Sequence, residues 1–226
     1  MSDTPYGAEI TGAADIPDIA DPEIAALLAP AQTIAQSDLD RLHAALGLAA
    51  ADRGDLDVAY RTLETPVGLM LLAATDQGVV RVAFDRENHD AVLETLGTRI
   101  SPRILRAPAR LDALARELDE YFAGKRRTFD LPLDLRLTAG FRRSVIEHLP
   151  DIRYGDTESY AEVARATGRP NAMRAVGTAC ATNPLPLVVP CHRVVRSDGS
   201  FGNYAGGPEA KRILLTLEAA SADAPS

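Results

Sequence analysis

The sequence predicts an α+β protein. We expect a small N-terminal domain with a three-stranded antiparallel sheet plus helices, followed by a mostly helical C-terminal domain with a winged-helix-like helix-turn-helix. Two observations predict this class. Three strand-like segments separated by short turns fill residues 58–85. After Pro132 the apolar residues recur at helical spacing, with a glycine-containing break between two of the helices.

The first 57 residues form an acidic N-terminal extension that we expect to be partly disordered or helical. Residues 1–20 are rich in Ala, Gly, Pro, Asp and Thr with weak periodicity, which favours disorder. Short helices are expected over 22–29 and 37–51, the second capped by Ser37. The partial apolar stripe of this second helix consists of Leu39, Leu42, Leu46 and Leu48.

The predicted α/β domain covers residues 58–138. Its strands are expected at Val58–Glu64, Leu69–Thr75 and Val79–Phe84, all rich in β-branched and aliphatic residues. Gly68 and Gly78 lie in the two turns, so the strands follow each other as a meander.

Two helices follow the strands, over 88–97 and 109–123. In the second, Leu111, Leu114 and Leu118 fall at helical spacing, and Gly124 can end the helix.

The C-terminal domain is predicted over 139–219, with a tail at 220–226. A helix near 141–149 ends at Pro150. Ser159 and Glu162 make a capping box for the next helix.

A helix-turn-helix outline follows this capping box. Gly168-Arg169-Pro170 breaks the chain, and Asn171 is expected to cap a second helix through about Thr182. Its surface is small, which favours either close helix packing or entry into a DNA minor groove.

Charge is unevenly distributed along the chain. The net charge of −8 comes from residues 1–57, which carry −9, whereas residues 139–219 carry +2. The chemistry-bearing segment is therefore compatible with a nucleic-acid partner. There is no basic, apolar leader and no membrane-length apolar run, and only Cys180 and Cys191 are cysteines. We therefore expect a cytoplasmic protein with reduced thiols and no membrane association.

One cysteine is a candidate nucleophile. Cys191 follows Pro190 and precedes His192, and a thiol near an imidazole can ionise to the nucleophilic thiolate. Neighbouring side chains of a strand point to opposite faces, so these two residues need a turn or a bridging water to interact. Cys180, on the alanine-rich helix, is expected to be a packed residue.

The surroundings of Cys191 resemble a known family. The matching stretches in order are Tyr154–Tyr160, Arg174–Gly177, Asn183-Pro184, Pro190–Val194, Gly202–Gly207 and Lys211–Glu218. Together they resemble the O6-alkylguanine-DNA alkyltransferases, also called methylated-DNA–protein-cysteine methyltransferases. More loosely, Thr65–Gly68 and Leu71–Thr75 resemble the N-terminal domain of that family, so the resemblance covers roughly residues 58–219.

The resemblance implies a catalytic set. Cys191 would accept the alkyl group, His192 would be its base through a water, and Glu218 would orient His192. Tyr160 would stabilise the leaving guanine, and Asn183 would fix the turn before the active-site strand.

The resemblance also implies contacts to DNA and to the substrate base. Arg174 would fill the gap left by a flipped nucleotide. Ala175, Thr178 and Arg193 would also contact DNA. The base itself would lie against Tyr160, Val194, Tyr204, Ala205 and Gly206. Some relatives carry a serine at the position of Ala205, so that contact to the guanine oxygen would here come from a backbone N–H.

The implied activity is DNA repair by one irreversible transfer of an alkyl group from O6-alkylguanine, and from O4-alkylthymine, in double-stranded DNA. This corresponds to a methylated-DNA–[protein]-cysteine S-methyltransferase that acts as a monomer without a cofactor. Residues 1–57 contain no cysteine, which excludes the Cys-rich metal domain of some relatives. Two other classes stay open: a non-catalytic helix-turn-helix DNA-binding module, and a cysteine hydrolase.

Overall fold

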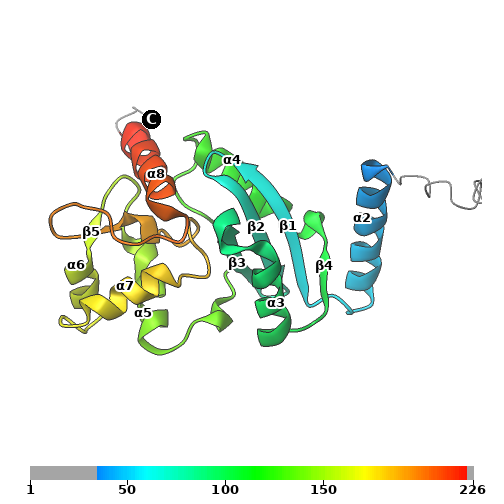
Figure 1. Cartoon of the computed structure of the whole chain (residues 1–226), viewed down its shortest axis with the longest axis horizontal. Coiled ribbons are helices and arrows are strands. Elements are labelled where there is room, and N and C mark those ends of the chain that lie inside the picture. Colours follow the sequence, from blue (N-terminus) through cyan, green and yellow to red (C-terminus); the bar gives the residue numbers. More distant parts are fainter. Residues whose placement is uncertain (1–34, 223–226) are drawn as a thin grey trace, which may run out of the picture. The chain divides into compact units, whose positions relative to one another are not determined.

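In the computed structural model, a four-stranded sheet with strand order β3-β2-β1-β4 lies between residues 58 and 106 (Figure 1). Strands β1 (Val58–Thr65), β2 (Gly68–Thr75) and β3 (Gly78–Phe84) form the predicted antiparallel meander. A fourth strand, β4 (Ile104–Arg106), pairs in parallel with β1. The sequence pattern did not indicate β4, because three residues are too few to show a strand period.

The structure describes residues 35–222, so the disorder expected for 1–20 and the helix expected at 22–29 lie outside the described residues. From Asp40 onward the chain forms one compact unit. No helix in the described part of the chain is both long and apolar enough to cross a membrane.

Helix α2 (Gln36–Asp52) confirms the helix expected at 37–51, but its packing differs from the predicted stripe. Leu42 and Leu46 are 58% and 48% exposed, whereas Gly47 and Ala50 are buried. A Cβ on Gly47 would lie 2.9 Å from the Cβ of Ala107. The helix therefore packs through its smallest residues, because the neighbouring backbone approaches too closely for leucine.

The sheet is covered on both faces. Helix α3 (His89–Arg99) packs Val92 and Leu96 against one face, and the side chain of Asn88 accepts hydrogen bonds from the first turn of α3. Helix α4 (Asp112–Phe122) covers the other face. Both helices lie where the apolar spacing predicted them.

The residues from 58 up to Gly140 are called the N-terminal half below, and the part of the chain from Gly140 onward is called the C-terminal half. The C-terminal half consists of helices and one two-stranded parallel sheet. Its elements are α5 (Gly140–His148), β5 (Glu158–Ser159), α6 (Tyr160–Ala166), α7 (Met173–Ala181), β6 (Val194–Val195) and α8 (Gly207–Ala222). Short 3-10 turns are η1 (Asp85–Glu87), η2 (Pro108–Leu111), η3 (Leu135–Leu137), η4 (Leu149–Asp151) and η5 (Cys191–Arg193).

The capping residues of the helix-turn-helix were predicted with mixed success. Ser159 and Glu162 form the expected reciprocal capping box at the start of α6. Helix α7 instead begins at Met173 with Ala172 as its N-cap and no side-chain cap, so the expected cap by Asn171 is wrong. Asn171 and Ala172 lie in the turn before the helix, and Ala172 N–H bonds back to Arg169. The extra turn moves the helix start past Asn171.

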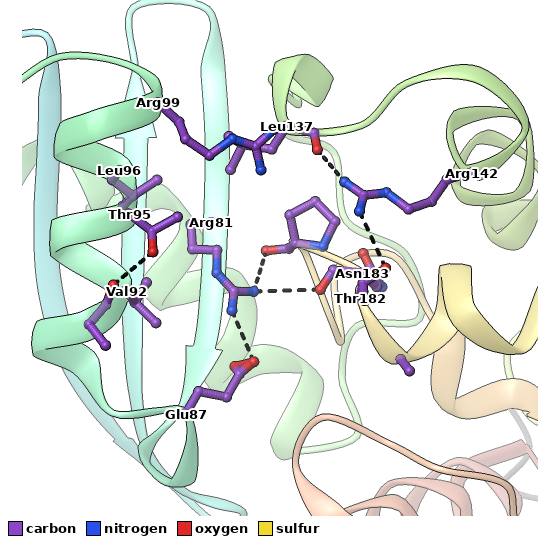
Figure 2. Close-up of a pocket in the computed structure, with 13 residues that line it drawn as sticks. Arg81, Glu87, Val92, Thr95, Leu96, Arg99, Leu137, Arg142, Thr182 and Asn183 are labelled. Carbon is purple, nitrogen blue, oxygen red and sulfur yellow. Dashed lines mark hydrogen bonds and ion pairs between the residues drawn. The ribbon is translucent and has the colours of Figure 1, made fainter.

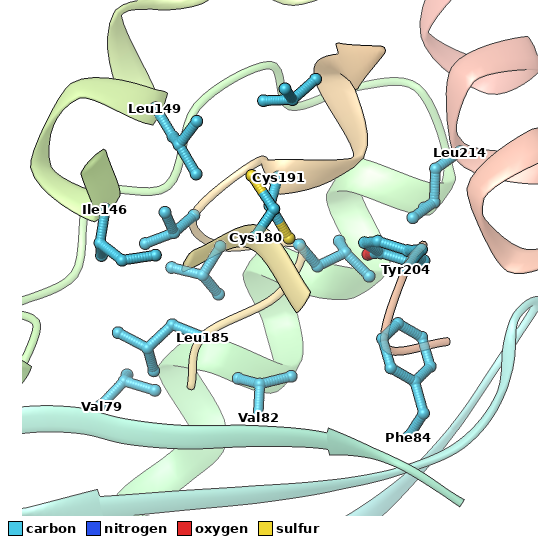
Figure 3. Close-up of a cluster of buried hydrophobic side chains, with 14 of the residues drawn as sticks. Val79, Val82, Phe84, Ile146, Leu149, Cys180, Leu185, Cys191, Tyr204 and Leu214 are labelled. Carbon is cyan, nitrogen blue, oxygen red and sulfur yellow. The ribbon is translucent and has the colours of Figure 1, made fainter. Parts of the chain in front are cut away.

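The two halves share one hydrophobic core. Met70, Leu72 and Phe84 of the sheet belong to the same buried cluster as Val145 of α5 and Leu214 of α8. Figure 3 shows part of this cluster, with Val79, Val82 and Phe84 of the sheet on one side and Cys180 and Cys191 on the other. Burial of this apolar surface joins the halves, so the position of the C-terminal helices depends on the sheet.

Gly78→Ala is expected to destabilise the protein by about 2 kcal/mol or more. Gly78 has φ of +140°, and a Cβ there would overlap the carbonyl oxygen of Pro132, which accepts the Val79 N–H at 2.9 Å. Urea unfolding measures the change. The matched control is Gly97→Ala inside α3, where the new methyl meets only ordinary contacts. It should be neutral or stabilising by up to about 1 kcal/mol. Equal effects of the two substitutions would contradict this account.

Candidate active site

Cys191 lies on a buried 3-10 turn rather than on a strand. Pro190 precedes the turn, and its carbonyl accepts the Arg193 N–H at 3.0 Å. Cys191, His192 and Arg193 are all buried, and β6 follows directly. The turn therefore supplies the change of direction that a strand would lack, so neighbouring side chains need not face opposite sides.

Asn183 reaches the sulfur of Cys191 directly. It follows α7 and is 2% exposed. Its side-chain Nδ2 donates to Cys191 Sγ at 3.1 Å and to the Val189 carbonyl at 2.9 Å. Its Oδ1 accepts the Leu185 N–H at 2.9 Å. All of these bonds lie within one short segment, so the side chain both shapes the turn and stabilises negative charge on sulfur.

Glu218 on α8 accepts hydrogen bonds from several parts of the fold. Its Oε1 accepts from His192 Nε2 at 2.8 Å, from the Tyr121 hydroxyl at 2.7 Å and from Arg193 Nη2 at 2.9 Å. Its Oε2 accepts from Arg193 Nε at 2.9 Å and from the Gly155 N–H at 3.2 Å. The carboxylate is 1% exposed, so these donors replace its water shell.

The donors keep Glu218 ionised. Burial is the largest influence and raises the pKa of Glu218, but the hydrogen bonds from His192 and Arg193 outweigh it and bring the pKa to about 2. An ionised carboxylate requires a proton on the facing His192 Nε2.

His192 has its second ring nitrogen free. Burial lowers the pKa of His192, against the opposing effect of Glu218, so the imidazole is neutral at pH 7. With the proton on Nε2, Nδ1 carries a lone pair. This Nδ1 is buried and has no hydrogen-bond partner among residues 35–222. His192 is therefore a base with its accepting nitrogen available.

The thiol of Cys191 is protonated at rest. Burial raises the pKa of Cys191 to about 11, although the Asn183 hydrogen bond and the positive charge of Lys211 both lower it. A thiol in this state reacts slowly until a base removes its proton. Cys180 is buried as well, as expected for a packed residue.

Lys211 was missed as a functional residue, although it lay in one of the matching stretches. It is fully buried on α8, and its Nζ donates to the Val194 carbonyl at 2.5 Å. Burial lowers the pKa of Lys211. The sequence carried only a partial signal, because Lys211 stands between Ala210 and Leu214 at a helical spacing where an apolar residue is usual, and its burial is shown by the structure.

The structure does not support the expected DNA contact of Arg193. Its side chain is 6% exposed, and its guanidinium donates to Glu218 and to the Ile152 carbonyl. A phosphate could be reached only by breaking a buried ion pair. Arg193 instead holds the carboxylate that orients His192.

The exposed face of α7 carries the other predicted DNA contacts. Arg174, Ala175 and Thr178 are exposed, whereas Val176 and Ala179 are buried. The Arg174 guanidinium makes no ion pair among the residues that the structure describes. This face presents one long cation beside the exposed Met173, with small residues along the rest of the helix.

Tyr160 and Arg174 line one cavity of about 370 Å³, together with Gly177 and Gly202. Gly202 is close enough that a Cβ there would overlap the Tyr160 hydroxyl. Burial raises the pKa of Tyr160, so its hydroxyl keeps its proton. It can therefore act as a hydrogen-bond donor inside the cavity.

The segment from Tyr204 to Gly206 packs against the sheet. The ring of Tyr204 meets Phe84 edge-on at 5.5 Å between centroids, and His192 at 6.3 Å. A Cβ on Gly206 would lie 2.8 Å from the Phe84 ring. Ala205 is half-buried, and Val194 is fully buried. Tyr204 thus borders the His192 imidazole, while Tyr160 lies on the cavity.

Comparison with known proteins assigns the family. The DNA binding domain of 6-O-methylguanine DNA methyltransferase matches residues 140–220, and its ribonuclease-like domain matches residues 58–135. The Methylated-DNA--protein-cysteine methyltransferase of Mycolicibacterium paratuberculosis is 38% identical over 161 residues, which cover 71% of this chain and 92% of the relative. The chain belongs to the 6-O-methylguanine DNA methyltransferase family.

Solved structures of family members have the same fold. The Mycobacterium tuberculosis O6-methylguanine methyltransferase is 35% identical with a TM-score of 0.66, over 75% of this chain and 96% of that one. The M. tuberculosis OGT solved in complex with DNA is 35% identical with a TM-score of 0.64, over 72% of this chain and 94% of that one. The extension before residue 58 lies outside both matched family domains.

Glu218→Gln should destabilise this methyltransferase-family protein by about 3 kcal/mol at pH 7, because it leaves Arg193 buried without its counter-charge. The pKa of Glu218 falls from an ordinary 4.5 to about 2 on folding, so its contribution is complete above pH 4.5 and is lost as pH falls through 2. Urea unfolding across this range should show the variant and wild-type stabilities converging at low pH.

Glu209→Gln is the matched control for this measurement. Glu209 also lies on α8 and pairs with Arg212, but both are exposed, so its loss should change stability little. A gap between wild type and Glu218→Gln that stays constant down to pH 2 would contradict the assignment of an ionised, structure-holding carboxylate.

Proposed function

We propose that this protein repairs DNA by moving an alkyl group from O6-alkylguanine to the sulfur of Cys191. The observation that carries the proposal is the arrangement around that sulfur. Asn183 donates to it at 3.1 Å, and the adjacent His192 is held by Glu218, with its other ring nitrogen unpartnered within the described part of the chain. Membership of the 6-O-methylguanine DNA methyltransferase family supports the substrate, since the curated relatives are named for methylated DNA.

The transfer is a nucleophilic displacement at carbon. His192 Nδ1 takes the thiol proton through an intervening water, and Glu218 stabilises the imidazolium that forms. The sulfur–carbon bond forms while the carbon–O6 bond breaks, and its electrons remain on the guanine. The Tyr160 hydroxyl then supplies the proton that neutralises the leaving base, after which His192 releases its extra proton to solvent and Tyr160 regains one from solvent. In net terms the thiol proton is exchanged for the alkyl group.

The product is a thioether on Cys191, which is a poor leaving group. The neighbouring thiol, Cys180, is buried, and burial raises its pKa, so it stays protonated and does not displace the alkyl group. The protein is therefore consumed once per lesion, as a stoichiometric reagent.

The O6 substituent must leave the base stack to reach a buried sulfur. Base flipping costs a few kcal/mol. Arg174 on the small-surfaced α7 can offset this cost by entering the minor groove and filling the vacated space. Asn183, Val194 and the segment Tyr204–Gly206 would surround the flipped base. We extend the proposal to double-stranded DNA, to O4-alkylthymine and to a cytoplasmic monomer.

Wild-type protein mixed with excess duplex containing O6-methylguanine should gain the mass of one methylene group and then stop. Peptide mapping should place the group on Cys191 and leave Cys180 unmodified. Cys191→Ser should bind the same duplex, with affinity that falls as salt rises, and should form no comparable adduct. Repair of more than one equivalent of duplex would overturn the stoichiometric mechanism. Binding by the wild type without an adduct would favour the non-catalytic DNA-binding module.

Gly202→Ala should slow methyl transfer roughly tenfold or more, because the new methyl displaces the Tyr160 hydroxyl from the leaving base. The measurement is the single-turnover rate with a methylated duplex. Alkylation of Cys191 by iodoacetamide needs no leaving-base donor and should be unchanged, which serves as the internal control. A wild-type transfer rate in the variant would remove Tyr160 from the mechanism.

A further inference from the structure

Hydrogen bonds from β3, in the N-terminal half of the chain, hold the turn that carries Asn183. The Val82 N–H donates to the Pro184 carbonyl at 2.8 Å. Arg81 Nη1 donates to the carbonyls of Val82 at 2.9 Å, Pro184 at 3.2 Å and Asn183 at 3.5 Å. Figure 2 shows Arg81 between Glu87 and the Thr182–Asn183 segment that follows α7. These residues line a cavity of about 490 Å³.

The Arg81 guanidinium is itself held in place. Its Nη2 donates to Glu87 Oε1 at 2.9 Å, and Glu87 Oε2 accepts the Phe84 N–H at 3.0 Å. The two side chains are only 16% and 21% exposed. A carboxylate that binds one side of a planar guanidinium already fixes its orientation. The remaining N–H groups can then donate hydrogen bonds with little further loss of side-chain conformational entropy.

Two of the three carbonyls that Arg81 contacts, those of Asn183 and Pro184, lie just after the C-terminus of α7. The C-terminus of a helix carries partial negative charge and favours a nearby cation. The Arg81 guanidinium donates to the backbone at this position. Arg81 therefore fixes the backbone at the residue whose side chain contacts the nucleophile.

The position of that backbone decides the geometry at sulfur. The Asn183 amide group donates one N–H to the Val189 carbonyl at 2.9 Å and the other to Cys191 Sγ at 3.1 Å. Hydrogen bonds weaken steeply as their angles depart from linearity, so a small rotation of the Asn183 peptide would weaken the bond to sulfur.

We propose that Arg81, oriented by Glu87, is a positioning residue of the alkyl acceptor: from the N-terminal half it holds Asn183 against the sulfur of Cys191. The inference rests on the proposed role of Cys191. It gives the sheet domain a direct part in the chemistry, in addition to its part in the core. The functional consequence is on thiol acidity, because the Asn183 bond lowers the pKa of Cys191.

Other groups also face the sulfur and must stay constant in a test. They are Lys211 on α8, Cys180 on α7, Tyr160 on α6, Glu87 on η1, the adjacent His192 on η5, and Tyr204 in the loop before α8. Of these, Lys211 lowers the pKa of Cys191 and Glu87 raises it. Substitutions at Arg81 leave all of these groups chemically unchanged but remove the ion-pair partner of Glu87, so a variant that keeps a positive charge beside Glu87 is needed as a control.

The test measures the acidity of Cys191 without DNA. Full-length protein is alkylated with iodoacetamide at a series of pH values under folding conditions, and the adduct on Cys191 is quantified by peptide mapping. Arg81→Met should move the pH midpoint of the reaction upward by about one unit, a roughly tenfold slower reaction at neutral pH. An unchanged midpoint would overturn the proposal.

Two variants separate positioning from charge and from general loosening. Arg81→Lys keeps the positive charge but cannot bridge Glu87 and the carbonyls together, so it should shift the midpoint upward as well. A wild-type midpoint in this variant would mean that charge alone acts. Arg142→Met removes a second arginine of the same cavity that bonds to Thr182 and Leu137 rather than to Asn183. It should leave the midpoint unchanged, and an equal shift would refute a specific role for Arg81.

A double variant tests whether Arg81 acts through Asn183. In Asn183→Ala the bond to sulfur is already lost, so adding Arg81→Met should move the midpoint no further. Additive shifts would overturn the proposal. Because iodoacetamide replaces the DNA substrate, these outcomes do not depend on methyl transfer, and a failure of the proposed function would appear in the methylated-duplex assay instead.

Discussion

The buried carboxylate of Glu218 is the constraint on which the site depends. A charge removed from water costs several kcal/mol unless donors replace its hydration. Here the donors come from α4 through Tyr121, from the turn at Gly155, and from η5 through His192 and Arg193. The charge is therefore stable only when these elements are all in place. The same carboxylate fixes the tautomer of the His192 imidazole. The imidazole therefore acquires its reactive tautomer only when the fold is assembled.

The thiol of Cys191 is unreactive in the resting protein, because it stays protonated until a base removes its proton. Burial holds the thiol of Cys191 protonated and the imidazole of His192 neutral. Asn183 and Lys211 partly offset the cost of charging the sulfur, but neither makes it a standing thiolate. A reagent that can act once gains from this restraint, since a permanently ionised thiol would be exposed to oxidation and to adventitious electrophiles.

The N-terminal half contributes to the chemistry through contacts as well as through the core. Tyr121 donates to the carboxylate that orients the base, and Phe84 packs against Tyr204 beside the imidazole. The sheet also meets the turn of Asn183 through a backbone hydrogen bond to Pro184. A C-terminal half lacking these partners would leave the Glu218 carboxylate with fewer donors, which explains physically why the two halves share one core.

The sequence by itself determined the local elements and the family to which the chain belongs. Runs of β-branched and aliphatic residues located the strands, helical apolar spacing located most helices, and the Ser159–Glu162 capping box set a helix start. Only the tertiary structure decided that Arg193 serves the carboxylate instead of DNA, and that Lys211 is buried beside the sulfur. The reason is distance along the chain: Tyr121 and Glu218 are 97 residues apart, and Arg193 and Glu218 are 25 apart. Local patterns report which face of an element is apolar, whereas the partner of a buried charge is set by which elements the shared core brings together.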